Sequence, residues 1–290
     1  MFDNGLFEKF KHTKTRDGIL DMSEDKDFTF TSVERNIWKL SSKDGLYFAK
    51  PVNKSRMDAE VLLGQLHNQV GLNAAIYFPC QNLSFQGSNL SQNQILDLQN
   101  SRYAVSNNVL NSSSVLALDC YDSFNENNGL KPPMPYLFFS ANSAVDYTKY
   151  FTKDAMRQLI KSFVFGITEY NYDMHWKNIG YEVSEGIVKN VFTFDNGASG
   201  LGAKRVLDDQ EYCSFLQPEW FNRNSSLVEI KENPVVNQII SNREIANDLG
   251  SVDVVETSKD ISKELGYKFS SFYVDKLARA YDETAELFYK

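Results

Sequence analysis

Two short stretches near the start of the chain, residues 36–40 and 46–50, are rich in apolar and aromatic residues. Such stretches predict β-strands, and the polar stretch 41–45 between them predicts a turn. The second strand ends on Lys50. A lysine at a strand end can present its ammonium group from a rigid position, although most such lysines only face solvent.

The apolar spacing changes to that of an α-helix directly after this hairpin. Ser55 is the expected N-cap, with the acidic Asp58 three positions later, and Gly71 is expected to close the helix. Glu60 lies in the expected first turn, where the helix dipole alone favours an acidic residue. The apolar positions of this helix are Met57, Val61, Leu62, Leu66 and Val70.

Three further elements are predicted in the second half of the chain. A helix with a broad apolar face begins near Thr152, and a hairpin follows over residues 179–194, with its turn at 184–186. A last helix over residues 272–289 is expected to pack on the C-terminal part of the protein. The apolar face of the first of these elements comprises Ala155, Met156, Leu159, Ile160, Phe163, Val164 and Ile167.

These elements predict an α+β protein with two lobes. Residues 1–110 form a small β-rich N-terminal lobe, and residues 111–290 form a larger, helical C-terminal lobe, with a hinge near residues 106–116. A chain of 290 residues with 42% hydrophobic content is long enough to bury a core in each lobe.

Polar residues with a regular spacing stand between the helix that begins near Thr152 and the following hairpin. Asp173 could accept the proton of an attacking hydroxyl group, as the catalytic aspartate of a kinase does. Asn178 and, after the hairpin, Asp195 could hold Mg²⁺, which prefers oxygen ligands. This set predicts ATP-dependent phosphoryl transfer, with ATP and Mg²⁺ as cofactors.

The spacing alone would be a weak indication, because Asp, Asn and His also gather in turns, where they cap backbone groups. The upstream elements strengthen it. In kinases a helix glutamate pairs with a strand lysine and holds it on the nucleotide phosphates. We therefore expect an ion pair between Lys50 and Glu60.

The polar segment also resembles a known family. The catalytic loop of HipA-like bacterial serine/threonine kinases, N-x-D-x-H-x-K-N, is similar to this chain at Asn171, Asp173, His175, Lys177 and Asn178. The helix that carries Glu60 and the Phe194-Asp195 pair are similar to that family's helix and metal-binding aspartate. The resemblance implies a protein-kinase-like fold, a protein substrate and autophosphorylation, with His175 and Lys177 in the catalytic loop.

The nucleotide contacts are less sharply indicated. The chain contains neither G-x-x-x-x-G-K-[ST] nor G-x-G-x-x-G, so the phosphate-covering loop has no glycine signature. The best candidate is the segment 31–36, with Ser32, Arg35 and Asn36 as phosphate contacts. Near the hinge, Val105 and Val109 are candidates for backbone contacts with adenine.

Other functions share part of this pattern. Aminoglycoside and choline phosphotransferases resemble H-G-D-x-H-x-x-N followed by an apolar strand and Asp. Here Asn171-Tyr172 replaces the His-Gly pair and Lys177 precedes the asparagine, which favours a protein substrate. A nucleotide-binding pseudokinase and a nucleotidyl transferase are further alternatives.

Composition limits the kinds of partner and the compartment that we expect for this protein. A formal charge of −8 argues against a nucleic-acid partner, because a phosphate backbone demands a basic surface. The apolar runs fall short of the roughly 18 residues of a membrane helix, and the first residues lack the pattern of a signal peptide. Cys80, Cys120 and Cys213 suit a reducing compartment. We expect a cytoplasmic protein without a membrane partner, and leave open export by a route that needs no signal peptide.

Overall fold

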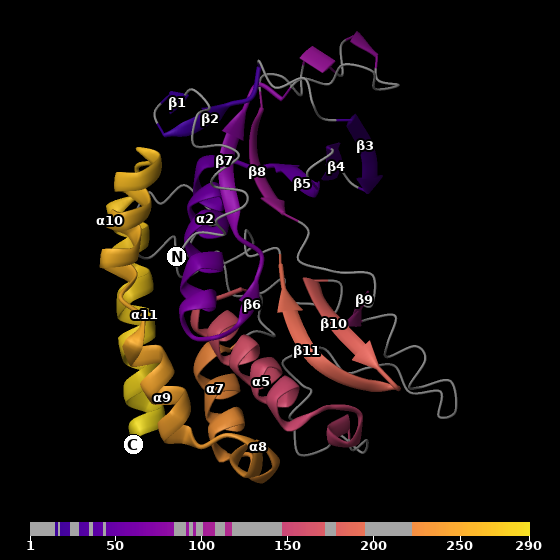
Figure 1. Cartoon of the computed structure of the whole chain (residues 1–290). Helices are drawn as coiled ribbons and strands as arrows, with labels where there is room; N and C mark the ends of the chain where they lie inside the picture. Colours follow the sequence, from indigo (N-terminus) through magenta and orange to yellow (C-terminus); the bar gives the residue numbers. More distant parts are fainter. Residues whose placement is uncertain are drawn as a thin grey trace.

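Strands dominate the first part of the chain and helices dominate its last part (Figure 1). The computed structural model describes residues 15–16, 18–23, 29–34, 37–42, 45–83, 91–92, 95–96, 101–107, 114–117, 147–171, 178–194 and 222–290. This distribution confirms the predicted α+β class, with a β-rich N-terminal part and a helical C-terminal part. The division of the chain at residue 110 stays a prediction.

Seven strands of the described chain form one sheet, in the order β1-β2-β7-β8-β5-β4-β3. Neighbouring strands are antiparallel except for β2 and β7, which are parallel. Their bounds are Thr15–Arg16 for β1, Ile19–Asp21 for β2, Thr29–Glu34 for β3, Ile37–Ser42 for β4, Gly45–Pro51 for β5, Tyr77–Gln81 for β7 and Arg102–Asn107 for β8.

The hairpin of β4 and β5 is present as predicted, and it ends just beyond Lys50. Tyr47 and Ala49 on β5 are buried, whereas Phe48 and Lys50 on the opposite face are only partly buried. This alternation follows from the two-residue period of a strand. Lys50 lies opposite Ala104 of β8, so it stands on an interior strand with neighbours on both sides.

The proposed phosphate-covering segment differs from the prediction. Residues 31–34 belong to strand β3 rather than to a loop, and Ser32 pairs with Trp38 of β4. The β-branched Thr31 and Val33 favour an extended backbone, and pairing with β4 satisfies its hydrogen bonds. A shift in register follows between Ser32 and Glu34. Only Arg35 and Asn36 separate the two strands, and both lie outside the described residues.

Helix α2, Lys54–Gln69, begins earlier than predicted. Its N-cap is Asn53, whose side-chain oxygen accepts a hydrogen bond from the Arg56 amide at 2.9 Å, so Ser55 is already a helical residue. An asparagine in this position satisfies a backbone donor that the first turn leaves unpaired. Glu60 consequently lies in the second turn, where the dipole of the helix end no longer accounts for it.

Gly71 ends α2 as predicted. It has a φ of 76°, the left-handed conformation that glycine adopts without a steric cost. The Leu72 amide donates to the His67 carbonyl at 3.0 Å, and the Gly71 amide donates to the Asn68 carbonyl at 3.2 Å. These two bonds form a Schellman motif, which satisfies carbonyl groups of the last turn.

A second sheet has the order β6-β11-β10-β9. Its bounds are Asn73–Ala74 for β6, Ser114–Leu116 for β9, Ile179–Ser184 for β10 and Ile187–Thr193 for β11. Strands β10 and β11 are the predicted hairpin, and its turn residues Glu185 and Gly186 both have positive φ angles. Strand β6 follows α2 in the chain but pairs in parallel with β11. The two sheets are therefore connected through α2 and β6.

The helix predicted from Thr152 is α5, Lys153–Thr168, and Thr152 is its N-cap. Every residue of its predicted apolar face is buried. A short 3₁₀ helix, η2 (Tyr147–Tyr150), precedes it, and α7 (Arg223–Glu232), α8 (Pro234–Ile239), α9 (Asn242–Ser251), α10 (Val254–Leu265) and α11 (Ser271–Tyr289) follow. The last of these is the predicted C-terminal helix, and it packs against α5, α9 and α10.

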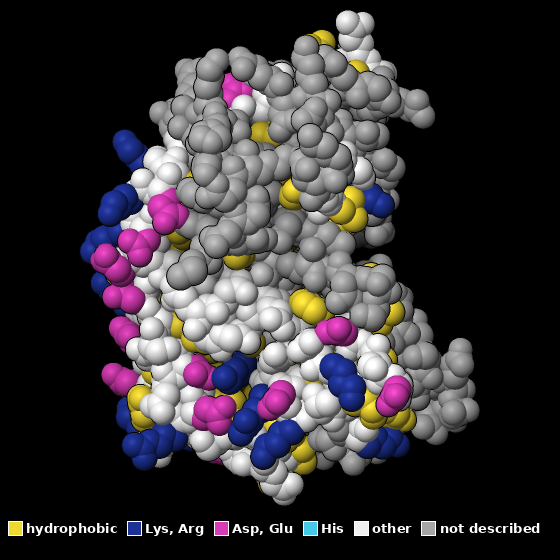
Figure 2. Space-filling model, viewed as in Figure 1, with side chains coloured by type: hydrophobic (Ala, Val, Ile, Leu, Met, Phe, Trp, Pro, Cys, Tyr) yellow, Lys and Arg dark blue, Asp and Glu magenta, His cyan; other side chains and the backbone are white. Residues whose placement is uncertain are grey.

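Helix α2 lies between the seven-stranded sheet and the helices α10 and α11 (Figure 1). In the face shown in Figure 2, side chains of both charges are interspersed along the edge that α10 and α11 form. No helix in the described part of the chain is long and apolar enough to cross a membrane. Cys80 is a buried thiol in β7, whereas Cys120 and Cys213 lie outside the described residues.

Candidate active site

Lys50 and Glu60 form the expected ion pair, which joins strand β5 to helix α2. The Lys50 side chain retains 14% of its exposure, whereas the Glu60 side chain retains none. A carboxylate without solvent is costly unless a charged or polar partner compensates it. The pair therefore fixes the ammonium group against α2, while the Lys50 side chain as a whole stays partly exposed.

Tyr77 on β7 also contacts the ammonium group of Lys50. The nitrogen lies 5.1 Å from the centre of the Tyr77 ring, within the range of a cation–π interaction. The ion pair with Glu60 and the contact with the Tyr77 ring together restrict the position of the ammonium group. This arrangement suits a lysine that binds a phosphate group.

Asn178 stands at the start of strand β10, where the β10–β11 hairpin begins. Its backbone carbonyl accepts a hydrogen bond from the Phe194 amide at 3.1 Å, and its side chain is largely buried. Figure 1 shows that β10 begins and β11 ends at the end of the hairpin nearest the seven-stranded sheet. Asp195, the other predicted magnesium ligand, follows Phe194 in the sequence and lies outside the described residues.

Several predicted site residues lie outside the described part of the chain: Arg35, Asn36, Val109, Asp173, His175, Lys177 and Asp195. Val105 is fully buried in β8, where it pairs with Ala49 on one side and Phe78 on the other. Its backbone is thus part of the sheet interior. The structure brings Lys50 and Glu60 together and sets Asn178 beside Phe194, while the roles of all these residues stay predictions.

Helix α5 is followed by a tight turn at Tyr170 and Asn171, directly before the sequence segment that contains Asp173. Tyr170 has a φ of 55°, a conformation that costs a residue other than glycine about 1–2 kcal/mol. The Asn171 amide donates to the Gly166 carbonyl at 2.8 Å, so α5 ends in a tight turn at these residues. The guanidinium group of buried Arg223 lies 5.2 Å from the centre of the Tyr170 ring. Sequence reasoning missed Tyr170 and Arg223, because neither belongs to a recognisable motif.

A cluster around the buried Asp58 holds the N-terminal part of α2. The carboxylate of Asp58 accepts hydrogen bonds from the Tyr267 hydroxyl at 2.7 Å and from the Ser270 amide at 3.2 Å, and it pairs with Lys54. Burial raises the pKa of Tyr267 above its usual value, and the negative charge of Asp58 adds to this shift. Burial lowers the pKa of Lys54, against the opposing effect of Asp58. Asp58 therefore anchors α2 to the segment between α10 and α11.

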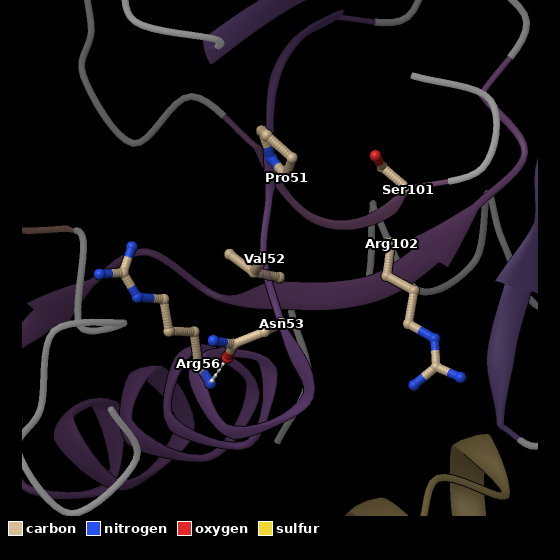
Figure 3. A pocket seen from close by; sticks show the side chains of 6 residues that line it. All are labelled: Pro51, Val52, Asn53, Arg56, Ser101 and Arg102. Atoms are coloured by element: carbon tan, nitrogen blue, oxygen red, sulfur yellow. Dashed lines mark hydrogen bonds between the residues drawn. The ribbon is translucent and has the colours of Figure 1, made fainter. Parts of the chain in front are cut away.

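A surface hollow of about 420 Å³ lies beside the connection from β5 to α2, just past Lys50 (Figure 3). Its lining comprises Pro51, Val52, Asn53, Arg56, Ser101 and Arg102. The two guanidinium groups point in different directions in Figure 3 and do not converge on one point. None of the predicted site residues lines this hollow.

The described residues contain no cluster of three or more His, Cys, Asp or Glu side chains arranged to hold a metal ion. The predicted magnesium ligands, Asn178 and Asp195, are an amide and a carboxylate. A pair of this kind suits Mg²⁺, which keeps several of its water ligands and takes the rest from carboxylates and substrate phosphates.

Comparison with known proteins gives structural similarity only. No protein-family model matches the chain, and no curated protein matches it significantly. Solved structures similar to it include the proinflammatory kinase CtkA of Helicobacter pylori, with 13% identity, coverage of 92% of this chain and 94% of that chain, and a TM-score of 0.48.

Two other similar structures belong to different kinds of protein. HipA of a toxin–antitoxin system of Shewanella oneidensis MR-1 has 10% identity, with coverage of 90% of this chain and 66% of that chain, and a TM-score of 0.37. The choline kinase LicA of Streptococcus pneumoniae has 11% identity, with coverage of 91% and 96%, and a TM-score of 0.24.

Proposed function

We propose that this protein is an ATP- and magnesium-dependent phosphotransferase that acts as a serine/threonine protein kinase of HipA-like type and phosphorylates itself. The observation that carries the proposal is the ion pair between Lys50 and Glu60. A strand lysine held by a buried helix glutamate is the arrangement with which kinases fix an ammonium group on nucleotide phosphates.

In this proposal each residue has a separate task. Lys50 binds the nucleotide phosphates, and Glu60 keeps its ammonium group in place. Asp173 orients the attacking hydroxyl group of the substrate and accepts its proton. Asn178 and Asp195 hold Mg²⁺, which neutralises charge on the phosphate oxygens when it is bound. His175 and Lys177 belong to the same loop, where His175 keeps the loop in shape through hydrogen bonds.

A protein substrate is supported by the sequence around Asp173. Lys177 stands before Asn178, as in the HipA-like pattern, and Asn171-Tyr172 stands where small-molecule phosphotransferases have a His-Gly pair. The remaining D-x-H-x-x-N spacing is shared with choline and aminoglycoside kinases, so transfer to a small molecule is the second candidate. The identity of the acceptor separates these two functions.

The first experiment is a transfer assay with γ-labelled ATP and Mg²⁺. The wild type is compared with Asp173→Ala, Asp195→Ala and a control, Asp282→Ala, which changes an exposed aspartate on α11. We expect label in the protein itself and in a basic protein acceptor. The loss should be roughly 10²–10⁴-fold in Asp173→Ala, the usual contribution of a positioned general base. The Asp195→Ala variant should in addition bind magnesium and nucleotide more weakly.

Each other result identifies an alternative. Label that reaches only choline or an aminoglycoside indicates a small-molecule phosphotransferase. ATP binding without any transfer indicates a pseudokinase, and label from α-labelled ATP on the product indicates nucleotidyl transfer. Full activity in both Asp173→Ala and Asp195→Ala would refute the proposed site.

A further inference from the structure

Three side chains from three helices meet in the protein interior at His67, Glu169 and Tyr281. His67 lies in the last turn of α2, Glu169 is the C-cap of α5, and Tyr281 is in the middle of α11. The His67 Nε2 atom and the Glu169 Oε1 atom are 2.7 Å apart, and the Tyr281 hydroxyl donates to the same oxygen at 2.5 Å. We call these residues the Glu169 cluster.

Neighbouring aromatic rings restrict the Glu169 cluster further. Phe165 of α5 contacts both His67 and Tyr281 edge to face, with centroid distances of 5.7 and 5.5 Å. The three residues of the cluster are each at most 1% exposed. Burial of a carboxylate is costly unless hydrogen-bond donors compensate it. The cluster therefore favours the one relative position of the three helices in which His67 and Tyr281 reach Glu169.

The cluster joins α2, which carries Glu60, to the C-terminal end of α5. His67 lies about two helical turns after Glu60 on the same helix. A movement of His67 along the helix axis would therefore also move Glu60. Glu169 is followed directly by Tyr170 and Asn171, where the segment with Asp173 begins. A shift of α2 along α5 would break the contact between His67 and Glu169.

We propose that Glu169 is a positioning residue that holds the Lys50–Glu60 pair in register with the C-terminal end of α5, which directly precedes the Asp173 segment in the sequence. The inference rests on the proposed function, because the relative position of α2 and the end of α5 affects catalysis only if the protein is a phosphotransferase. Misplacement of reacting groups by about 1 Å can lower a rate roughly 10²-fold without removing any catalytic group. Loss of the cluster should therefore lower kcat more than it changes the KM for ATP.

The main test compares Tyr281→Phe with Tyr267→Phe. Each variant removes one buried tyrosine hydroxyl that donates to a carboxylate at a helix, Glu169 in the first case and Asp58 in the second. Only Glu169 adjoins the segment that carries Asp173. We expect Tyr281→Phe to lower kcat about 10-fold or more, and Tyr267→Phe to leave kcat within about 2-fold. Equal losses in the two variants would overturn the inference.

Two substitutions of Glu169 test the position of its oxygen. Glu169→Gln keeps an oxygen that can accept from His67 and Tyr281, whereas Glu169→Ala removes it. We expect the glutamine variant to retain most of the kcat and the alanine variant to lose it with the KM for ATP nearly unchanged. A glutamine variant as inactive as the alanine variant would contradict a role in positioning through this oxygen.

Amide hydrogen exchange tests the coupling without activity. Tyr281→Phe should speed exchange in peptides that cover both residues 60–70 and residues 178–184, and Tyr267→Phe should leave the second region unchanged. Unchanged exchange over residues 178–184 in Tyr281→Phe would refute the coupling even if the protein is a kinase. If the wild type transfers no phosphate but Tyr281→Phe still changes exchange in both regions, the proposed function is refuted. The structural coupling then remains, without a role in catalysis.

Discussion

The ammonium group of Lys50 on β5 pairs with the carboxylate of Glu60 on α2, and this carboxylate has no contact with solvent. Because of this pair, the position of the Lys50 ammonium group depends on the position of α2. Glu60 in turn lies about two turns before His67 on that helix, where the Glu169 cluster holds α2. The position of the proposed phosphate-binding lysine is thus set by the packing of α2.

Breaking the Lys50–Glu60 pair should cost stability as well as activity. Lys50→Met leaves Glu60 buried without its cation, and removal of one partner of a buried pair typically costs about 3–5 kcal/mol. The double variant Lys50→Met with Glu60→Leu should be more stable than Lys50→Met alone, because no buried charge is left. Urea unfolding of the two single variants and the double variant measures this coupling.

The exposed pair of Lys259 and Glu256 on α10 is the matched control. The nitrogen and oxygen atoms are 3.2 Å apart, and the side chains are 66% and 58% exposed. Solvent screens such a pair, so Lys259→Met should change the free energy of unfolding by about 1 kcal/mol or less. Equal losses in Lys50→Met and Lys259→Met would argue against a buried, structurally required pair.

Gly64 allows α2 to approach the chain at Ala75. A Cβ atom added to Gly64 would lie 2.2 Å from the Ala75 carbonyl oxygen, a backbone atom that cannot move aside easily. We expect Gly64→Ala to push α2 away and to destabilise the protein by about 1–3 kcal/mol, as overpacking does. Glu60 lies one turn before Gly64, so phosphate transfer should fall in the same variant. Thermal unfolding and the transfer assay measure the two effects.

Gly250 in α9 is the control for this substitution. A Cβ atom there meets nothing within 4 Å, so Gly250→Ala replaces a poor helix former by a good one without a clash. The expected gain in stability is about 0.5–1 kcal/mol, with unchanged activity. A gain of the same size in Gly64→Ala would show that the approach to Ala75 is not restrictive.

The N-cap of α2 is a third test. Asn53→Ala removes the acceptor for the Arg56 amide and should cost about 1 kcal/mol, whereas Asn53→Gly should cost only about a few tenths. Glycine is tolerated there because the backbone can still be hydrated and adopts the cap conformation freely. Denaturant unfolding of the two variants provides the measurement. Equal costs in both would indicate that another residue caps the helix.

Buried tyrosines should make the protein sensitive to alkali. Burial raises the pKa of Tyr281 above its usual 10.0, with a further contribution from the charge of Glu169, and burial also raises the pKa of Tyr267 and Tyr103. A raised pKa in the folded state means that the stabilisation is fully present below pH 10.0 and is lost as the pH rises above it. Tyrosinate absorbance of these residues should therefore appear only together with unfolding.

The variant Tyr267→Phe tests the sign of this effect. It removes one phenol that binds its proton more tightly in the folded protein, so stability should fall less steeply with pH above 10.0 than in the wild type. The free energy of unfolding, measured by urea at several alkaline pH values, gives both slopes. A slope as steep as that of the wild type would contradict a raised pKa at Tyr267.

Local signals in the sequence were sufficient for several elements. Thr152 caps α5, Gly71 ends α2, and the turn at Glu185-Gly186 joins β10 and β11, because caps and tight turns depend on residues close together in the chain. The same locality explains the error at residues 31–34. This segment is expected to be a loop between two strands, but pairing with β4 provides partners for its backbone that the sequence does not reveal.

The amino-acid sequence alone indicated the β4–β5 and β10–β11 hairpins, the helices α2, α5 and α11, and the polar residue types of the candidate site. Packing in three dimensions brought together partners that the sequence did not indicate: β6 with β11, and His67 with Glu169 and Tyr281. These partners lie far apart along the chain. Caps and turns are closed by neighbouring residues, whereas a buried carboxylate takes its partners from whichever helices and strands pack around it.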